Sequence, residues 1–208
     1  MKMILASISL ALAGCTTQAP QPAWRAGAQS ALDGFTEAYL AGDSAAAGVE
    51  FSRARTGAAG TGDAANVGQV ELVRCAARAA SLDAAECGGF DALANDATPA
   101  QRAYAAYLAG RWQGLDVALL PEQHRKVVAG GAIAPIADPL SRLVAAGAAL
   151  RAGKLTPDGI ATATEAASTQ GWRRPLLAWL GVSIQRAQAL GDTQEVARLR
   201  RRVALAQP

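Results

Sequence analysis

Apolar residues recur at every third or fourth position along most of this chain, which is the spacing that gathers side chains on one face of an α-helix. In the first part of the sequence this pattern predicts helices over residues 23–41, 44–55 and 64–82. A glycine-rich segment, residues 56–63, separates the second helix from the third and is expected to form a loop. The chain is therefore expected to begin its folded part as a set of packed helices.

Capping signals predict where the later helices begin and end. Thr98, Asp138 and Thr156 can each cap a helix with a side-chain oxygen, and each is followed by a proline, which suits the first helical position. Glycines that are typical of helix ends follow at Gly110, Gly130, Gly153, Gly171 and Gly191. Together with two further prolines, these signals predict helices over residues 99–109, 121–129, 139–152, 157–170, 175–190 and 193–206.

No segment shows the alternation of a half-buried strand. Residues 115–120 form a short apolar run, which suits a turn or a helix as well as a strand. The predicted fold class is therefore all-α, an array of antiparallel helical hairpins that forms one domain over residues 23–208. A chain of this size can bury roughly 70% of its unfolded surface, so it needs no metal ion to fold.

One predicted hairpin resembles a known repeat. The Gly42-Asp43 turn is followed by Ala47, Phe51 and Ala54 at the offsets of the tetratricopeptide repeat. The last hairpin begins in the same way at Gly191-Asp192, but Val196 and Arg200 stand there in place of the expected alanine and large apolar residue. The resemblance implies an α-solenoid of helical hairpins.

The first residues have the features of a secretory signal. Lys2 supplies positive charge, and the apolar run over residues 4–12 is too short to span a bilayer, which needs about 20 residues. The segment Leu12-Ala13-Gly14-Cys15 then resembles the lipobox of bacterial lipoproteins. That resemblance implies a signal peptide over residues 1–14, cleavage before Cys15, and lipid on the Cys15 sulfur.

The residues after Cys15 bear on location. Thr16 stands where an aspartate usually retains lipoproteins of this type in the inner membrane, so the resemblance implies the outer membrane and its periplasmic face. Residues 15–22 contain two prolines and no apolar pattern, which predicts a tether that reaches at most about 25 Å. The first expected partner is therefore the membrane, through lipid on Cys15.

The other two cysteines, Cys75 and Cys87, form an even pair in a compartment that oxidises thiols. A disulfide between them requires the third helix to end near Leu82, because twelve residues of unbroken helix would hold the cysteines roughly 18 Å apart. Residues 83–86 can then turn the chain back. The alternative is a pair of small buried thiols on an apolar face.

The sequence contains no recognisable catalytic constellation and no metal or cofactor site. His124 is the only histidine, its neighbour Glu122 does not share its helix face, and a solvated side chain is expected. Residues 60–65 fit the Gly-x-Gly-x-x-Ala pattern of dinucleotide binding, but that mechanism needs a preceding strand and a helix is predicted there. No catalytic role is assigned to any residue.

Aromatic and basic side chains are the remaining candidates for recognition. The tryptophans that are expected to pack in the core are Trp112, Trp172 and Trp179. Arginines crowd the last predicted helix at Arg198, Arg200, Arg201 and Arg202. Cations stabilise a helix C-terminus, and the functional alternative for Arg198, Arg201 and Arg202 is contact with anionic head groups or an acidic partner.

The formal net charge of +3 and the expected compartment argue against nucleic acid as a partner. The lipid anchor and the helical hairpins predict a membrane-anchored periplasmic lipoprotein that acts as a binding or scaffold module for another envelope protein or assembly. The alternative is a hydrolase of cell-wall glycan or peptide, or its accessory protein, because paired carboxylates need not be close in sequence. A third hypothesis is a purely structural protein.

Overall fold

The computed structural model describes residues 22–207, and all regular structure in this part of the chain is helical, as predicted. The helices are α1 (Ala23–Ala41), α2 (Ser44–Ala59), α3 (Ala64–Ala80), α4 (Gly88–Asp91), α5 (Pro99–Leu108), the 3-10 helix η1 (Val117–Leu119), α6 (Glu122–Val128), α7 (Pro139–Arg151), α8 (Pro157–Thr169), α9 (Arg173–Ala189) and α10 (Thr193–Ala206).

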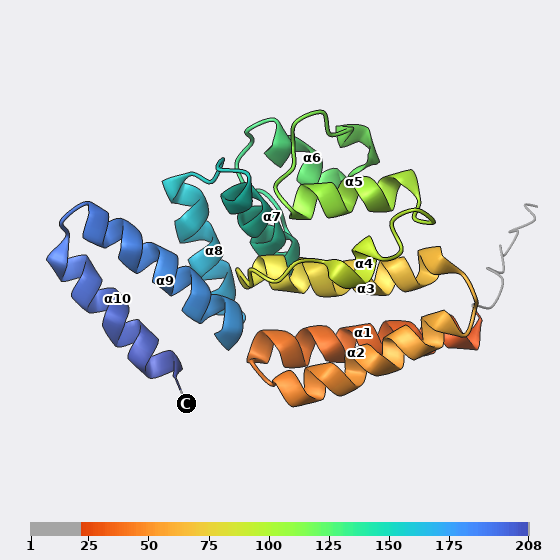
Figure 1. Ribbon diagram of the computed structural model, residues 1–208. Helices are drawn as coiled ribbons and strands as arrows, with labels where there is room; N and C mark the ends of the chain where they lie inside the picture. The colour runs from red at the N-terminus through yellow and green to blue at the C-terminus, as the bar shows by residue number, and fades with distance from the viewer. Residues whose placement is uncertain (1–21, 208) are drawn as a thin grey trace, which may run out of the picture.

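Helices α1 and α2 form an antiparallel hairpin, and α3 lies along it (Figure 1). The turn between α1 and α2 is sharp because Gly42 adopts a left-handed conformation with φ 94°, and the Asp43 side chain then accepts a hydrogen bond from the Ala46 amide. The rings of Phe35 and Phe51 meet across the hairpin with centroids 5.5 Å apart. Apolar faces of three successive helices thus share one core.

The largest core lies where α3, α5, α7, α8 and α9 meet. Helix α7 is buried along most of its length and packs against α3, which it approaches very closely at Gly147. A β-carbon built on Gly147 would lie only 2.0 Å from the carbonyl oxygen of Ala79. Backbone therefore meets backbone at this crossing, and only glycine fits there.

Helix α9 packs the C-terminal helices against α1 and α3. Its Trp179 is fully buried and donates a hydrogen bond from Nε1 to the carbonyl oxygen of Ala80 at 2.9 Å. At the start of α9, Arg174 stacks on the ring of Tyr39 at 4.3 Å and donates from Nε to the Tyr39 carbonyl oxygen at 2.6 Å. These contacts fix the C-terminal helices against the ends of α1 and α3.

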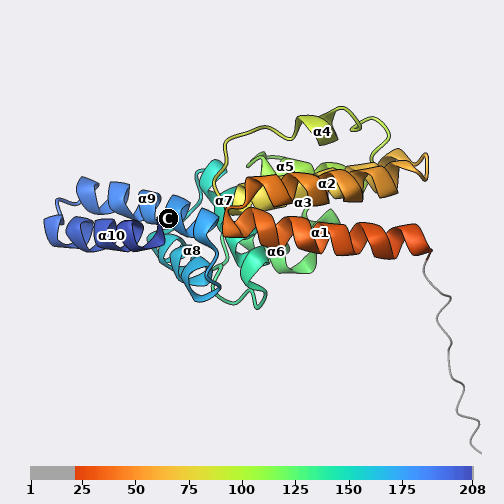
Figure 2. The same cartoon turned by 90° about the horizontal axis from the view of Figure 1, so that it is seen from below.

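The segment between α3 and α5, residues 81–98, crosses one side of the molecule and carries the short helix α4 (Figure 2). We call it the strap. A disulfide between Cys75 of α3 and Cys87 holds it down, with the two α-carbons 5.7 Å apart. The predicted pairing is confirmed, and so is its condition, because α3 ends at Ala80 and Leu82 turns the chain with φ 56°.

An ion cluster around one buried carboxylate lies beneath the strap. The Glu71 carboxylate is only 2% exposed and pairs with Arg74 and with Arg55, whose Nε lies 2.9 Å from Oε1. Gly89 of the strap covers this carboxylate so closely that a β-carbon there would meet Oε2 at 2.3 Å. The cluster links α2, α3 and the strap, and two guanidinium groups compensate the one buried carboxylate.

The C-terminal hairpin, α9 with α10, forms the far edge of the molecule (Figure 1). Its own small core consists of Leu180, Ala187, Val196 and Leu199, and α10 packs mainly against α9. Within residues 22–207, no helix has the length and apolar character needed to cross a membrane.

Candidate functional site

A groove of about 500 Å³ opens between α3, α5, η1 and α7, and we call it the apolar groove. Helix α3 contributes one stripe at helical spacing, and the other walls come from the start of α5, the residues around η1 and the start of α7. The residues that line it are Gln69, Leu72, Val73, Ala76, Ala100, Gln101, Tyr104, Leu119, Leu120, Pro121, Leu140, Ser141 and Val144.

The floor and the rim of the apolar groove differ. Leu72, Leu120 and Val144 form a floor that is almost fully buried, whereas Leu119 at the rim keeps 37% of its surface exposed. Gln69 on the rim is also exposed, and none of the lining residues carries a charged side chain. An apolar floor with a few amides and hydroxyls at its edge is typical of pockets that bind a ligand.

One wall of the groove leads into a buried aromatic cluster. Tyr104 stacks beside Tyr107, with centroids 6.1 Å apart, and the Tyr107 hydroxyl lies 3.2 Å from Nδ1 of His124. Trp112 stacks on the other side of Tyr107 at 5.5 Å. Burial raises the pKa of both tyrosines, so the cluster is uncharged.

The expectation that His124 is solvated is wrong. The side chain is only 1% exposed, and burial lowers its pKa to about 4, although Asp138 acts in the opposite direction. A neutral imidazole that is sealed behind Tyr104 and Tyr107 cannot reach a ligand in the apolar groove. His124 therefore has a structural role in the α5–α6 contact.

The buried carboxylate of Glu71 is no better placed for catalysis. Both of its oxygens are engaged, one by Arg55 and the other by Arg74, which itself stacks over the ring of Phe51 at 4.1 Å. It lies on the side of α3 that faces the strap, away from the apolar groove. Within residues 22–207, no group of three or more histidine, cysteine and acidic side chains could hold a metal ion.

The arginines of α10 make different contacts from one another. Arg198 forms a two-pronged ion pair with Glu195, with both N···O distances 2.6 Å, and Arg202 donates to the Ser168 hydroxyl of α8 at 3.2 Å. Arg201 is exposed and has no hydrogen-bond or ion-pair partner among the residues that the structure describes. The structure therefore does not gather Arg198, Arg201 and Arg202 into one site.

The remaining sequence candidates fall into three groups. Cys15, the predicted lipidation site, lies outside the described residues. Trp179 is buried, and Trp112 and Trp172 are half-buried against the main core, as expected for packing residues. The Gly-x-Gly pattern at residues 60–65 directly follows helix α2, not the strand that dinucleotide binding requires.

Comparison with known proteins adds no family. No protein-family model matches the chain, and no curated protein or solved structure gives a significant match. The resemblance to tetratricopeptide repeats therefore stays a resemblance, although Ala47 and Ala54 are buried in the α1–α2 hairpin at the offsets noted above.

Sequence reasoning did not find the apolar groove, but part of its signal was present. Gln69, Leu72, Val73 and Ala76 follow the i, i+3, i+4, i+7 spacing of a helix face. The apolar run before Pro121 supplies two further lining residues, Leu119 and Leu120. The sequence could not show that α5 and α7 leave this face of α3 partly uncovered, because that depends on how the helices cross.

Proposed function

We propose that this chain is a lipid-anchored envelope protein, facing the periplasm from the outer membrane, whose helical domain binds another envelope protein. The apolar groove is the observation that carries the proposal. Its volume of about 500 Å³ lies in the range of roughly 300 to 1,000 Å³ that is usual for ligand sites. Its uncharged lining favours apolar side chains over an anionic or cationic ligand.

The occupant that best fits this groove is an apolar segment of a partner protein. Buried Leu72, Leu120 and Val144 offer an apolar floor, and exposed Leu119 adds to the contact that a partner could cover. Gln69 and Ser141 at the edge supply groups that can hydrogen-bond to a partner backbone. A short stretch with a few apolar side chains would fill the space and leave its backbone at the rim.

The anchor supports the same reading from the sequence side. A lipobox-like segment that ends at Cys15 and the eight residues 15–22 would hold the start of α1 close to the membrane. A protein held in that position can bind other envelope proteins, and it needs no catalytic group to do so. A cell-wall hydrolase would instead use free carboxylates in a cleft, and the apolar groove contains none.

Site-specific photo-cross-linking in cells tests the proposal. A photoreactive residue at Gln69 or at Ala100, both exposed at the groove rim, should trap one discrete envelope protein. The same residue at Gln29, on the exposed side of α1, is the matched control and should not trap it.

A variant that fills the apolar groove provides a second test of the proposed site. Ala100→Trp should occupy the groove and abolish the cross-link from Gln69, while Ala45→Trp on exposed α2 should leave it unchanged. Equal cross-linking from Gln69 and Gln29, or a cross-link that survives Ala100→Trp in a folded protein, would contradict the proposed site.

A further inference from the structure

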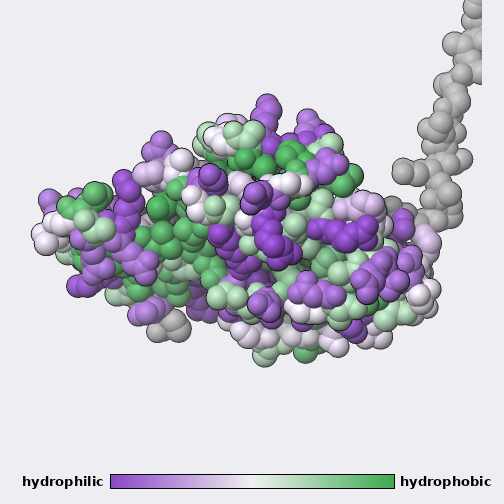
Figure 3. Space-filling model, turned by 45° about the horizontal axis from the view of Figure 1, so that its top comes forward, coloured by the Kyte–Doolittle hydropathy of each residue, from purple (hydrophilic) through white to green (hydrophobic). Residues whose placement is uncertain are grey.

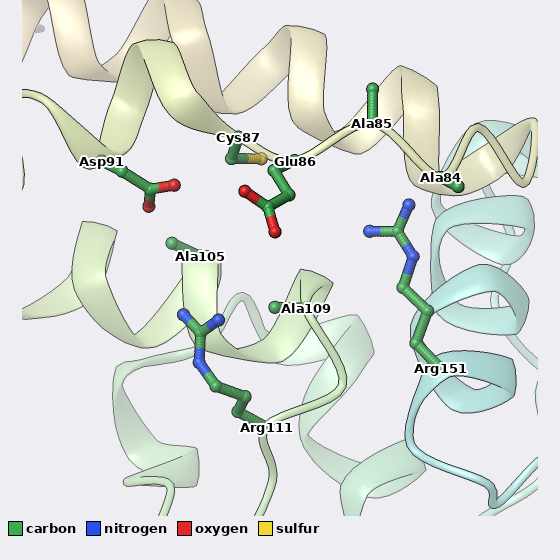
Figure 4. A pocket seen from close by; sticks show the side chains of 9 residues that line it. All are labelled: Ala84, Ala85, Glu86, Cys87, Asp91, Ala105, Ala109, Arg111 and Arg151. Carbon is green, nitrogen blue, oxygen red and sulfur yellow. The ribbon is translucent and has the colours of Figure 1, made fainter.

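A second cavity, between the strap and the ends of α5 and α7, gathers charged side chains of both signs. Its volume is about 350 Å³. Glu86 and Asp91 come from the strap, Arg111 follows the turn after α5, and Arg151 ends α7. In Figure 4, Glu86 and Asp91 point into the space from the strap above Ala105 and Ala109, Arg111 reaches up from below, and Arg151 stands at the right.

These opposite charges face one another without closing into ion pairs. None of the four side chains forms an ion pair with any residue in the part of the chain that the structure describes. On the face seen in Figure 3, hydrophilic side chains gather in the middle of the molecule, in contrast to the apolar surface beside the C-terminal hairpin. The carboxylates of Glu86 and Asp91 and the guanidinium group of Arg111 thus have no ion-pair partner among the described residues.

The walls of this cavity are fixed independently of any ligand. The disulfide to Cys75 holds Cys87, which lies between Glu86 and Asp91 along the strap. Arg151 donates from its two terminal nitrogens to the carbonyl oxygens of Leu108 at 3.1 Å and Asp83 at 2.5 Å. The disulfide and the Arg151 hydrogen bonds thus hold the strap against the ends of α5 and α7, which preorganises the walls of the cavity.

The charge pattern selects the ligand. Two carboxylates and two guanidinium groups sum to zero, so a lone anion or a lone cation would meet a like charge in the same cavity. A ligand that carries both signs can place its ammonium group by Glu86 or Asp91 and its carboxylate by Arg111, which has no other partner among the described residues. Each contact would then be a charge-assisted hydrogen bond.

We propose that this cavity binds a small ammonium–carboxylate zwitterion, of the size of an amino acid or a dipeptide. The small side chains of Ala105 and Ala109 leave room for the body of such a ligand above α5. The proposal does not rest on the apolar groove, which uses α3 and another face of α5 and shares no lining residue with this cavity.

Ligand-observed saturation-transfer NMR on the full-length chain, in an uncharged detergent and a buffer without zwitterions, tests this directly. D- and L-alanine and the dipeptide alanyl-alanine are the probes, and their methyl signals report binding. N-acetylalanine lacks the ammonium charge and alaninamide lacks the carboxylate, so both should bind roughly tenfold more weakly than the best zwitterion. Transfer to alanine or to the dipeptide supports the proposal and fixes the ligand size.

Variants assign the contacts. Arg111→Gln, Glu86→Gln and Asp91→Asn change exposed side chains and should leave the fold intact. Arg111→Gln should weaken zwitterion binding by roughly tenfold, and so should at least one of the acidic variants. Asp96→Asn, elsewhere on the strap, and Arg201→Gln on α10 are the matched controls. The proposal is overturned if none of the three zwitterions binds, if N-acetylalanine or alaninamide binds as tightly as the best zwitterion, or if Arg111→Gln leaves binding unchanged.

Discussion

At the scale of single residues, Gly147 sets how closely α3 and α7 can approach. Gly147→Ala would place a methyl group 2.0 Å from the Ala79 carbonyl oxygen, so the two helices must separate and the main core must repack. We expect the free energy of unfolding to fall by about 3 kcal/mol, measured by urea denaturation followed by circular dichroism.

Gly181 is the matched control for that substitution. It also lies within a helix, α9, but a β-carbon there would meet nothing within 4 Å. Gly181→Ala should therefore raise the free energy of unfolding by about 0.5 to 1 kcal/mol, because alanine is the better helix former. If both variants changed stability equally, the close approach of α3 and α7 would be refuted.

His124 should make stability depend on pH. In the folded chain its pKa is lowered from 6.5 to about 4, so between these values the unfolded chain binds a proton that the folded chain does not. The free energy of unfolding should therefore fall as pH drops through this window, by at most about 3 kcal/mol. Denaturation at pH 7 and at pH 5 measures the slope.

His124→Asn identifies the source of that slope. The amide can still take part in a hydrogen bond with Tyr107 but has no proton to gain in this range. Its unfolding free energy should change less between pH 7 and pH 5 than that of the natural chain. An identical slope in both proteins would show that other groups cause the pH dependence.

At the scale of elements, local signals predicted what depends on neighbours in sequence. The Thr98, Asp138 and Thr156 side chains do cap α5, α7 and α8, with the following proline in the first turn of each helix. All five glycines predicted to end helices have positive φ, between 66° and 87°. Such signals depend on backbone hydrogen bonds within one turn, so the sequence alone can carry them.

Elements that depend on distant contacts were predicted less well. Helix α2 continues to Ala59, four residues beyond the predicted end, because Ala58 is buried against α1. Helix α9 begins at Arg173 rather than at Pro175, since a proline is tolerated anywhere among the first amides that lack a helical partner. Helix α4 begins with two glycines, and the disulfide and the buried ring of Phe90 help to keep it in place.

The candidate sites, too, were predicted only where the signal is local in sequence. His124 was misjudged because α6 reads as a short polar helix, and its burial comes from Tyr104 and Tyr107 of another helix. The charged cavity joins Glu86, Arg111 and Arg151 across 65 residues, a distance over which no pattern in one sequence gives a signal. The cysteine pair could be predicted from the sequence. Its argument needs only an even number of remaining cysteines, the expected oxidising compartment and a helix end between Cys75 and Cys87.

The disulfide is the main covalent constraint on the strap. In the chain-entropy estimate, closing a loop between residues separated by 12 positions stabilises the fold by about 3 kcal/mol. Reduction should lower the unfolding free energy by about that amount, measured by denaturation with and without dithiothreitol. In mass spectrometry, thiol-blocking reagent added without reductant should modify neither Cys75 nor Cys87.

The double variant Cys75→Ala/Cys87→Ala is the control for reduction. It should be less stable than the oxidised chain, and dithiothreitol should have no further effect on it. If both cysteines of the natural chain were alkylated without reductant, the disulfide would be disproved for the protein as it occurs in the cell.

At the scale of the whole molecule, the proposed lipid on Cys15 would hold both candidate sites close to the membrane. We expect Cys15→Ala to abolish incorporation of labelled fatty acid and to remove the chain from the membrane fraction, or to leave unprocessed precursor. Cys75→Ala/Cys87→Ala should still incorporate the label, which separates lipidation from general loss of thiols. Labelled fatty acid in the Cys15→Ala protein would contradict the proposed anchor.

The position of α10 has a consequence for how the molecule opens. Apart from the hydrogen bond between Arg202 and Ser168, it depends on α9 and on a core of four buried side chains. Separating it from α9 breaks few contacts elsewhere, so its amide protons should exchange with solvent deuterium well before those of α3 and α7. The C-terminal end is then a local cooperative unit, which can detach transiently while the apolar groove and the charged cavity keep their shape.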